Sequence, residues 1–260
     1  SGSHDLDARV DEVHRQGAIV SVNHDKEPLP WKYDYPDMDC FEIYHGHWLT
    51  GDDGILKTYD RFLAEGRRIS LIGGSDYHQP EDLMPPSLFG LGRPTTVLWL
   101  PHLDAASVVG GLKSGHGYIM ESPTGPHLAF TVDGHPFFWG GGVHQFGGHV
   151  TVDVEVTGTA GDRLVWVSEA GEIFDTMIPS NAWQHSFDIE APEKFLRAQI
   201  VAKHSRDRLI GELLDWCKGG AKLQRARQSL TDHLPIMRAL SNPVYFDALA
   251  LTEKPAAGGS

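Results

Sequence analysis

The sequence lacks the cysteines that a disulfide framework or a cysteine-rich zinc site would need. Its 260 residues contain two cysteines, Cys40 and Cys217, and no Cys-x-x-Cys pair. It also lacks an apolar run long enough to cross a membrane, and no signal peptide is visible. We therefore expect no membrane association. The compartment stays unknown, with the cytoplasm as the default.

Positive charge is scarce as well. Lys and Arg total 22 against 35 Asp and Glu, which gives a formal net charge of −13. A surface of that sign repels phosphate backbones, so we expect no nucleic-acid partner. Histidine is abundant by contrast, at 15 residues, and hydrophobic residues make up 40%, which is enough for a buried core.

The first half of the chain alternates between helical and strand patterns. Apolar residues at helical spacing predict a helix that ends near Gly17, and the β-branched run 18–24 predicts a strand buried on both faces. Further strands are predicted at 40–45, 68–74 and 95–100, and further helices at 55–63 and 105–112. Such alternation predicts an α/β unit with a parallel sheet.

The pattern changes near Pro123. From 127 to about 202, apolar and polar residues alternate, and Gly and Pro clusters separate the segments, which predicts a small antiparallel β-sandwich. Residues 207–240 are polar and partly helical in pattern, and 242–246 predict a returning strand. The predicted domains are 4–122, an α/β metal-binding domain, and 123–250, a sandwich with a helical insertion and the returning strand.

Potential metal ligands stand at the ends of three successive predicted strands. His24 ends the first strand, His45 and His47 end the second, and Asp76 and His78 end the third. Function in parallel α/β folds collects beyond the carboxyl ends of the strands, so we expect these side chains on one rim. Imidazole and carboxylate ligands suit Zn, Mn or Fe. A cation there would polarise an ester oxygen and lower the pKa of bound water.

Each of these residues also has an ordinary structural explanation. A strand-end histidine often binds a backbone carbonyl, and a Gly-Gly-Ser-Asp sequence is common in turns. Their joint placement at consecutive strand ends favours the metal site over that explanation. Trp31, Tyr33 and Trp48 lie in loops of the same rim, where they could form the wall of a substrate pocket or simply pack.

These segments together resemble the polymerase and histidinol phosphatase (PHP) superfamily, in particular its CehA/McbA-like metallohydrolases. Residues 18–24 resemble the family strand that ends in a metal-binding histidine, and 41–44 resemble the strand that follows it. Residues 72–78 resemble the most diagnostic family motif, whose Asp and His bind metal. Residues 112–118, the β-domain and Asn242-Pro243 also fit that branch.

The resemblance implies a distorted (β/α) barrel with a metal cluster, in which His24, Asp76 and His78 are ligands and Asp76 also orients the attacking water. The upstream family motifs, a His-x-His, a Thr-Asp-His and a bridging glutamate, have no counterpart in this chain. His45 stands where the family usually has asparagine. We therefore expect a partial or distorted (β/α) barrel of PHP type followed by the β-sandwich, with His45 or His47 replacing a lost ligand.

The expected function is that of a metal-dependent hydrolase that activates water for attack on phosphate esters, with Asp76 and His78 as catalytic residues. Zinc or manganese is the expected metal, and iron is an alternative. A carbamate or carboxylic ester hydrolase and a non-catalytic metal-binding scaffold are the alternative functions. The expected substrate is a small-molecule ester. Because an incomplete barrel leaves open sheet edges, we also expect a homodimer or a separately supplied N-terminal half.

Overall fold

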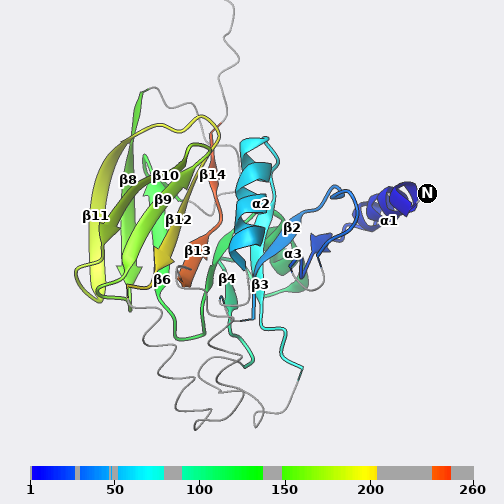
Figure 1. Cartoon of the computed structure of the whole chain (residues 1–260), viewed down its shortest axis with the longest axis horizontal. Coiled ribbons are helices and arrows are strands. Elements are labelled where there is room, and N and C mark those ends of the chain that lie inside the picture. Colours follow the sequence, from blue (N-terminus) through cyan, green and yellow to red (C-terminus); the bar gives the residue numbers. More distant parts are fainter. Residues whose placement is uncertain are drawn as a thin grey trace, which may run out of the picture.

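The computed structural model describes residues 2–26, 30–46, 48, 52–78, 90–136, 148–203 and 236–246. Figure 1 shows the long antiparallel strands gathered on one side, a helix-covered layer beside them, and the N-terminal helix furthest out on the other side. The fold within these residues is mixed α/β, with mostly antiparallel sheets and few helices.

A small parallel sheet forms where the sequence predicts the first three strands. Its order is β1 (Ser21–Val22), β2 (Cys40–His45) and β3 (Ser70–Gly74), and both pairings are parallel. The central strand is buried at every position, as expected of a strand covered on both faces. The helices α1 (Gly2–Arg15) and α2 (Asp52–Ala64) precede β1 and β3 in the chain.

Helix α2 covers one face of this sheet. Its buried apolar residues, which include Ile55, Tyr59 and Phe62, recur at helical spacing and join Phe41 and Ile43 in one core. The outer edge of β1 pairs with no described residue. The expected association with a second copy or an N-terminal half stays a prediction.

The fourth predicted strand does not join the parallel sheet, and the described residues do not show the expected PHP-type barrel. β4 (Thr95–Leu98) pairs antiparallel with β5 (Gly117–Met120), which follows α3 (Ala105–Lys113). Glycine at position 117 lets the two strands approach closely enough to pair. Any other residue there would place its Cβ 2.0 Å from the carbonyl oxygen of Val97. The sheets formed by the described residues stay open and close no barrel.

Two antiparallel sheets form the larger part of the structure. One has the order β10-β9-β12-β13-β5-β4, with β14 also paired to β12, and the other has the order β11-β8-β6-β7. Alternation in the sequence explains the packing, since every second residue of β8 is buried. The bounds not yet given are β6 (His127–Val132), β7 (His135–Pro136), β8 (His149–Thr157), β9 (Arg163–Ser168), β10 (Gly171–Met177), β11 (Ala182–Glu190), β12 (Phe195–Val201), β13 (Met237–Ser241) and β14 (Val244–Tyr245).

The boundary predicted at residues 122 and 123 falls inside the larger sheet, because β13 lies between β5 and β12. One face of this sheet packs on the opposite sheet, and the other face packs on the parallel layer. Asn242 joins the layers directly: its Oδ1 accepts the N–H of Leu71 at 2.8 Å, and its Nδ2 donates to the carbonyl of Gly117 at 3.0 Å. Most of the predicted helical insertion lies outside the described residues.

Candidate metal centre

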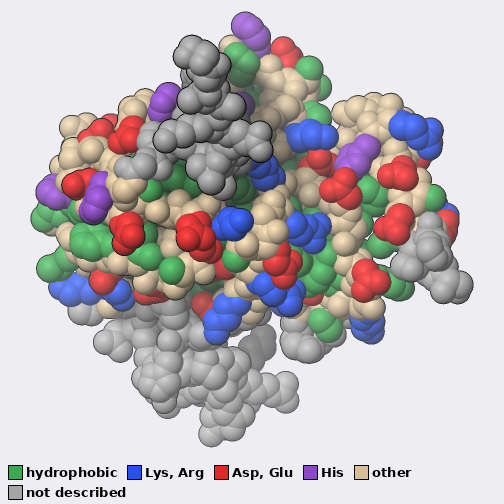
Figure 2. All heavy atoms as spheres, turned by 90° about the horizontal axis from the view of Figure 1, so that it is seen from above, with side chains coloured by type: hydrophobic (Ala, Val, Ile, Leu, Met, Phe, Trp, Pro, Cys, Tyr) green, Lys and Arg blue, Asp and Glu red, His purple; other side chains and the backbone are tan. Residues whose placement is uncertain are grey.

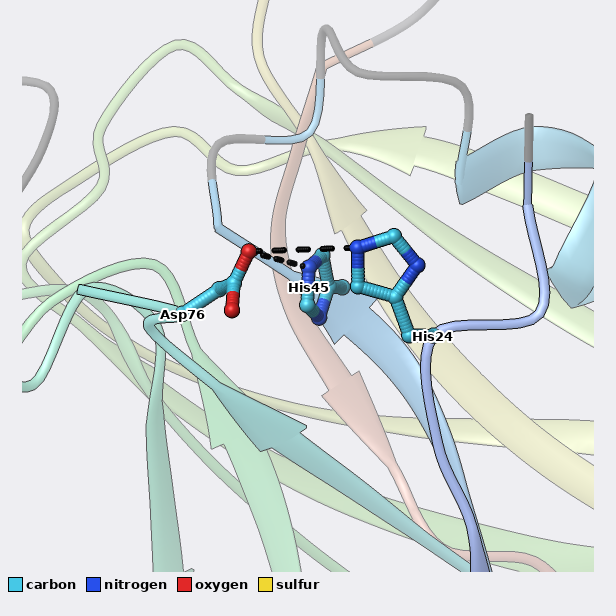
Figure 3. Close-up of side chains that lie close together, drawn as sticks. All are labelled: His24, His45 and Asp76. Carbon is cyan, nitrogen blue, oxygen red and sulfur yellow. Dashed lines mark ion pairs between the residues drawn. The ribbon is translucent and has the colours of Figure 1, made fainter. Parts of the chain in front are cut away.

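Three predicted ligands meet beyond the carboxyl edge of the parallel sheet. His24 follows β1, His45 is the last residue of β2, and Asp76 follows β3. Each offers a ligand atom, and these atoms all lie within 4.8 Å of one another, so the group could hold a metal ion. Figure 3 shows the three side chains pointing toward a common space from three separate chain segments.

The spacing of the ligand atoms fits a small divalent cation. Oδ2 of Asp76 lies 2.9 Å from Nε2 of His45 and 3.9 Å from Nε2 of His24. A tetrahedral zinc ion with ligand bonds of about 2.1 Å separates its ligand atoms by roughly 3.4 Å. The buried Nδ1 of His24 has no hydrogen-bond partner among the described residues. Changes of about half an ångström would bring these two distances from Asp76 to the value expected for zinc.

Two of the three residues have an unusual backbone conformation. His24 has a φ of 59° and Asp76 a φ of 49°, both in the left-handed region that residues other than glycine seldom adopt. Asp133 shares it with a φ of 48°, but it lies in an Asp-Gly hairpin turn that requires it. Strained residues of this kind cluster at functional sites, and here the strain directs two side chains inward.

Glu42 supports both histidines, and the sequence analysis did not single it out. Its buried Oε2 lies 2.8 Å from Nδ1 of His45 and accepts the backbone N–H of His24 at 3.0 Å. A carboxylate on the far nitrogen of a histidine ligand is the usual support of protein metal sites. Gly74 makes room for it, since a Cβ there would lie 2.6 Å from Oε1 of Glu42. A glutamate within an otherwise apolar strand was the available signal.

Buried charges also hold the backbone of His45. Burial lowers the pKa of His45, but the hydrogen bond and the charge of Glu42 outweigh it, so the pKa lies above its ordinary value. Nζ of Lys26 donates to the carbonyl of His45 and to Oδ1 of Asp52, both at 2.8 Å. Oδ2 of Asp52 accepts the N–H of His45 at 3.3 Å, and burial raises the pKa of Asp52 to about 7 against the attraction of Lys26.

The replacement of Glu42 by glutamine should weaken metal binding without unfolding the chain. The amide oxygen can still accept from His45, but the negative charge that strengthens the imidazole as a ligand is lost. We expect zinc affinity to fall about 10- to 100-fold, measured by competition with a chelating dye. The matched control is Glu65→Gln, which makes the same exchange at an exposed carboxylate just after the end of α2. Equal zinc affinities of Glu42→Gln and the control would contradict the supporting role.

The other predicted site residues are not part of this three-residue group. Nε2 of His78 lies 3.3 Å from Oδ1 of Asp76, so His78 is joined to the centre through Asp76, and its side chain is 72% exposed. Predicted ligand His47 lies outside the described residues. Cavities lined by sandwich residues are present elsewhere in the structure.

The predicted aromatic wall separates into two parts. Trp31 and Tyr33 contact each other on the loop after His24, and Tyr33 is exposed. Asp25 fixes this loop by accepting the backbone N–H of Trp31 at 2.7 Å. Trp48, in contrast, is fully buried against Tyr44, so its place in a pocket wall is corrected to a place in the core.

The distribution of charge on the molecular surface gives little information about the function. Figure 2 shows Lys and Arg side chains interspersed with Asp and Glu side chains on the face seen from above. Among the described residues, no helix is both long and apolar enough to cross a membrane.

Comparisons with known proteins give no relative for this chain. A scan against protein-family models, a search of curated proteins and a search of solved structures each find no match. The resemblance to the PHP superfamily therefore stays a prediction, and the geometry of the site is what bears on the function.

Proposed function

We propose that this chain is a metal-dependent hydrolase that cleaves phosphate esters at the site formed by His24, His45 and Asp76. The observation that carries the proposal is the approach of two imidazole nitrogens and one carboxylate oxygen to a common space. A divalent cation held there would supply a positive charge that polarises an ester oxygen and eases the deprotonation of water. Two nitrogens and one oxygen with an open side suit catalytic zinc first, and manganese or iron next.

The residues around the proposed cation site would have the remaining roles in the reaction. Glu42 holds the Nδ1 proton of His45, so that Nε2 presents its lone pair toward the site. Asp76 would offer Oδ2 as a ligand, while its Oδ1 faces Nε2 of His78 at 3.3 Å and orients that imidazole. Since His78 is exposed at the rim, it can reach a bound ester, and we assign to it the proton that the leaving oxygen receives.

Phosphate esters come first among the substrates for an electrostatic reason. The chain carries a net charge of −13, so an anionic ester would be repelled unless a bound cation dominates the local field. A cation with an open side offers phosphoryl oxygens that attraction. Carbamate and carboxylic esters remain the second class, because the same charge polarises a carbonyl.

The substrate class can be tested with two aryl esters that share one chromophoric leaving group, a phosphate and a carbamate. We expect faster release from the phosphate by the zinc- or manganese-loaded chain, loss of release with a chelator, and its return with metal. Faster release from the carbamate would favour the second class. Bound metal without turnover of either ester would make the chain a metal-binding scaffold.

Substitution of His78 by glutamine should separate catalysis from metal binding. Glutamine keeps a polar group beside Asp76 but cannot deliver a proton. We therefore expect zinc affinity to stay within about twofold, while turnover falls about 100- to 10,000-fold, as is typical for loss of a general acid. His102→Gln, in an exposed loop, is the matched control. Turnover that persists in His78→Gln would contradict the proton-transfer role.

A further inference from the structure

The larger sheet ends in an edge strand with little protection. β10 pairs with β9 on one side, and among the described residues nothing pairs with its other edge. Natural edges are usually guarded by charged residues, above all lysine, by proline, by bulges or by short length. β10 has seven residues and contains neither Lys nor Pro, so its guards are the acidic residues Glu172 and Asp175 and one bulge between Glu172 and Phe174. It also exposes 39% of Ile173, 39% of Phe174 and 57% of Met177.

A groove with a volume of 660 Å³ lies beside this edge, between the two sheets. Its apolar surface comes from Ile173 and Phe174 of β10 and from Phe187 and Ile189 of β11, and the rings of Phe174 and Phe187 are 4.9 Å apart. β11 is itself an edge strand, so the groove is the open side of the sandwich. Figure 1 shows both strands on the side of the molecule away from α1.

The rim of the groove has one sign of charge. No Lys or Arg is among the described residues that line it, whereas its acidic members are Glu169, Asp188, Glu190 and Glu193. Glu169 is already engaged, because its carboxylate accepts the backbone N–H of Glu193 at 2.8 Å and that of Lys194 at 3.2 Å. Oδ1 of Asp188 lies 3.8 Å from Nδ1 of His149, and this carboxylate together with those of Glu190 and Glu193 gives the groove a negative potential.

We propose that β10 is a docking edge for an extended basic segment of a partner protein, which adds to the sheet as a further strand. The backbone of such a segment would pair with the outer N–H and C=O groups of β10. Every second side chain would point into the groove, so apolar residues would contact Phe174, Phe187 and Ile189. Flanking Lys or Arg side chains would face the acidic rim. This inference is independent of the proposed hydrolase function.

Charge selects this occupant over a second copy of the chain. Pairing of β10 with β10 across a two-fold axis would bring two acidic rims together, and like charges across an interface oppose association. A basic segment of another protein has no such repulsion. The attraction of the rim should also weaken as salt is added, because the carboxylates are close to solvent.

The experiment uses the full chain and a short fluorescent peptide of alternating lysine and valine, followed by anisotropy. We expect saturable binding that is lost for an alternating glutamate–valine peptide and for the lysine–valine peptide with a central proline, which cannot complete the backbone pairing. Ile173→Lys should weaken binding about tenfold or more, as for an interface hot spot. Glu190→Lys should weaken it in the same direction, and Leu103→Lys, at an exposed loop residue, should leave it unchanged.

Three results would overturn the proposal. The first is absence of saturable binding, and the second is equal binding of the proline-containing peptide, which would reduce the effect to charge alone. The third is a dimer in sedimentation that Ile173→Lys dissociates, which would assign the edge to a second copy. Circular dichroism of Ile173→Lys verifies that the variant is folded, and Glu190→Lys tests the rim without changing β10.

Discussion

Replacement of Asp76 by asparagine is expected to abolish stoichiometric zinc binding and, with it, hydrolysis of an aryl phosphate. Oδ2 of Asp76 faces both histidine nitrogens, so we expect it to contribute the charge as well as the third ligand atom of the site. Asparagine presents a neutral oxygen, a much weaker ligand for zinc. Metal content after gel filtration measures the binding, and release of the aryl leaving group measures the activity.

We expect Asp76→Asn to change the backbone conformation little. Asp76 has a φ of 49°, and asparagine adopts the left-handed region at least as readily as aspartate. Asp133→Asn, at the other aspartate with a positive φ, repeats the same exchange far from the site and should leave metal content and activity unchanged. Stoichiometric zinc in Asp76→Asn, or equal losses in both variants, would remove the assignment of Asp76 as a ligand.

Replacement of Asp60 by leucine is expected to destabilise the whole chain by about 3–5 kcal/mol, because it leaves the buried charge of Arg197 without its partner. The guanidinium binds both oxygens of Asp60 at 2.7 Å, which joins α2 to β12. The side chain of Arg197 is only 1% exposed, whereas that of Asp60 is 28% exposed. Urea unfolding of the wild type and the variant gives the difference in free energy.

The variant with both Asp60→Leu and Arg197→Met should recover part of this loss. It removes the unpaired charge and leaves only the oxygen of Gln199, which accepts from Arg197 at 2.7 Å, without its donor. Asp5→Leu, which breaks an exposed pair with Arg9, is the matched control and should change stability by less than about 0.5 kcal/mol. If the double variant were no more stable than Asp60→Leu alone, the unpaired charge of Arg197 would not be the cause of the lost stability.

Local patterns in the sequence were enough to place His24, His45 and Asp76 at the ends of neighbouring strands. The runs before His24 and Asp76 are short, apolar and rich in β-branched residues or glycine, so their ends could be located without knowledge of the fold. Parallel pairing then brings the ends to one edge, as observed for His24, His45 and Asp76. The alternation of β8 likewise predicted an antiparallel strand with one buried face.

Contacts between distant parts of the chain were beyond such patterns. Met120 of β5 pairs with Ala239 of β13, and no local periodicity encodes a pairing over that separation. The same limit explains why the antiparallel direction of β4 was missed and why the sequence could not decide whether Trp48 lines a pocket or packs in the core. Glu42 was missed for another reason: a buried charge in a strand signals a role, but its partners His24 and His45 appear only in three dimensions.

The central claim is that His24, His45 and Asp76 bind one metal ion together, and X-ray absorption at the zinc edge of the zinc-loaded chain tests it most directly. The account predicts a first shell of two imidazole nitrogens and at least one oxygen, at about 2.0–2.2 Å. In His24→Ala or His45→Ala, measured at a zinc concentration that keeps the weakened site occupied, the multiple-scattering signal of imidazole should fall by half. A first shell of oxygen alone, or one that neither substitution changes, would contradict it.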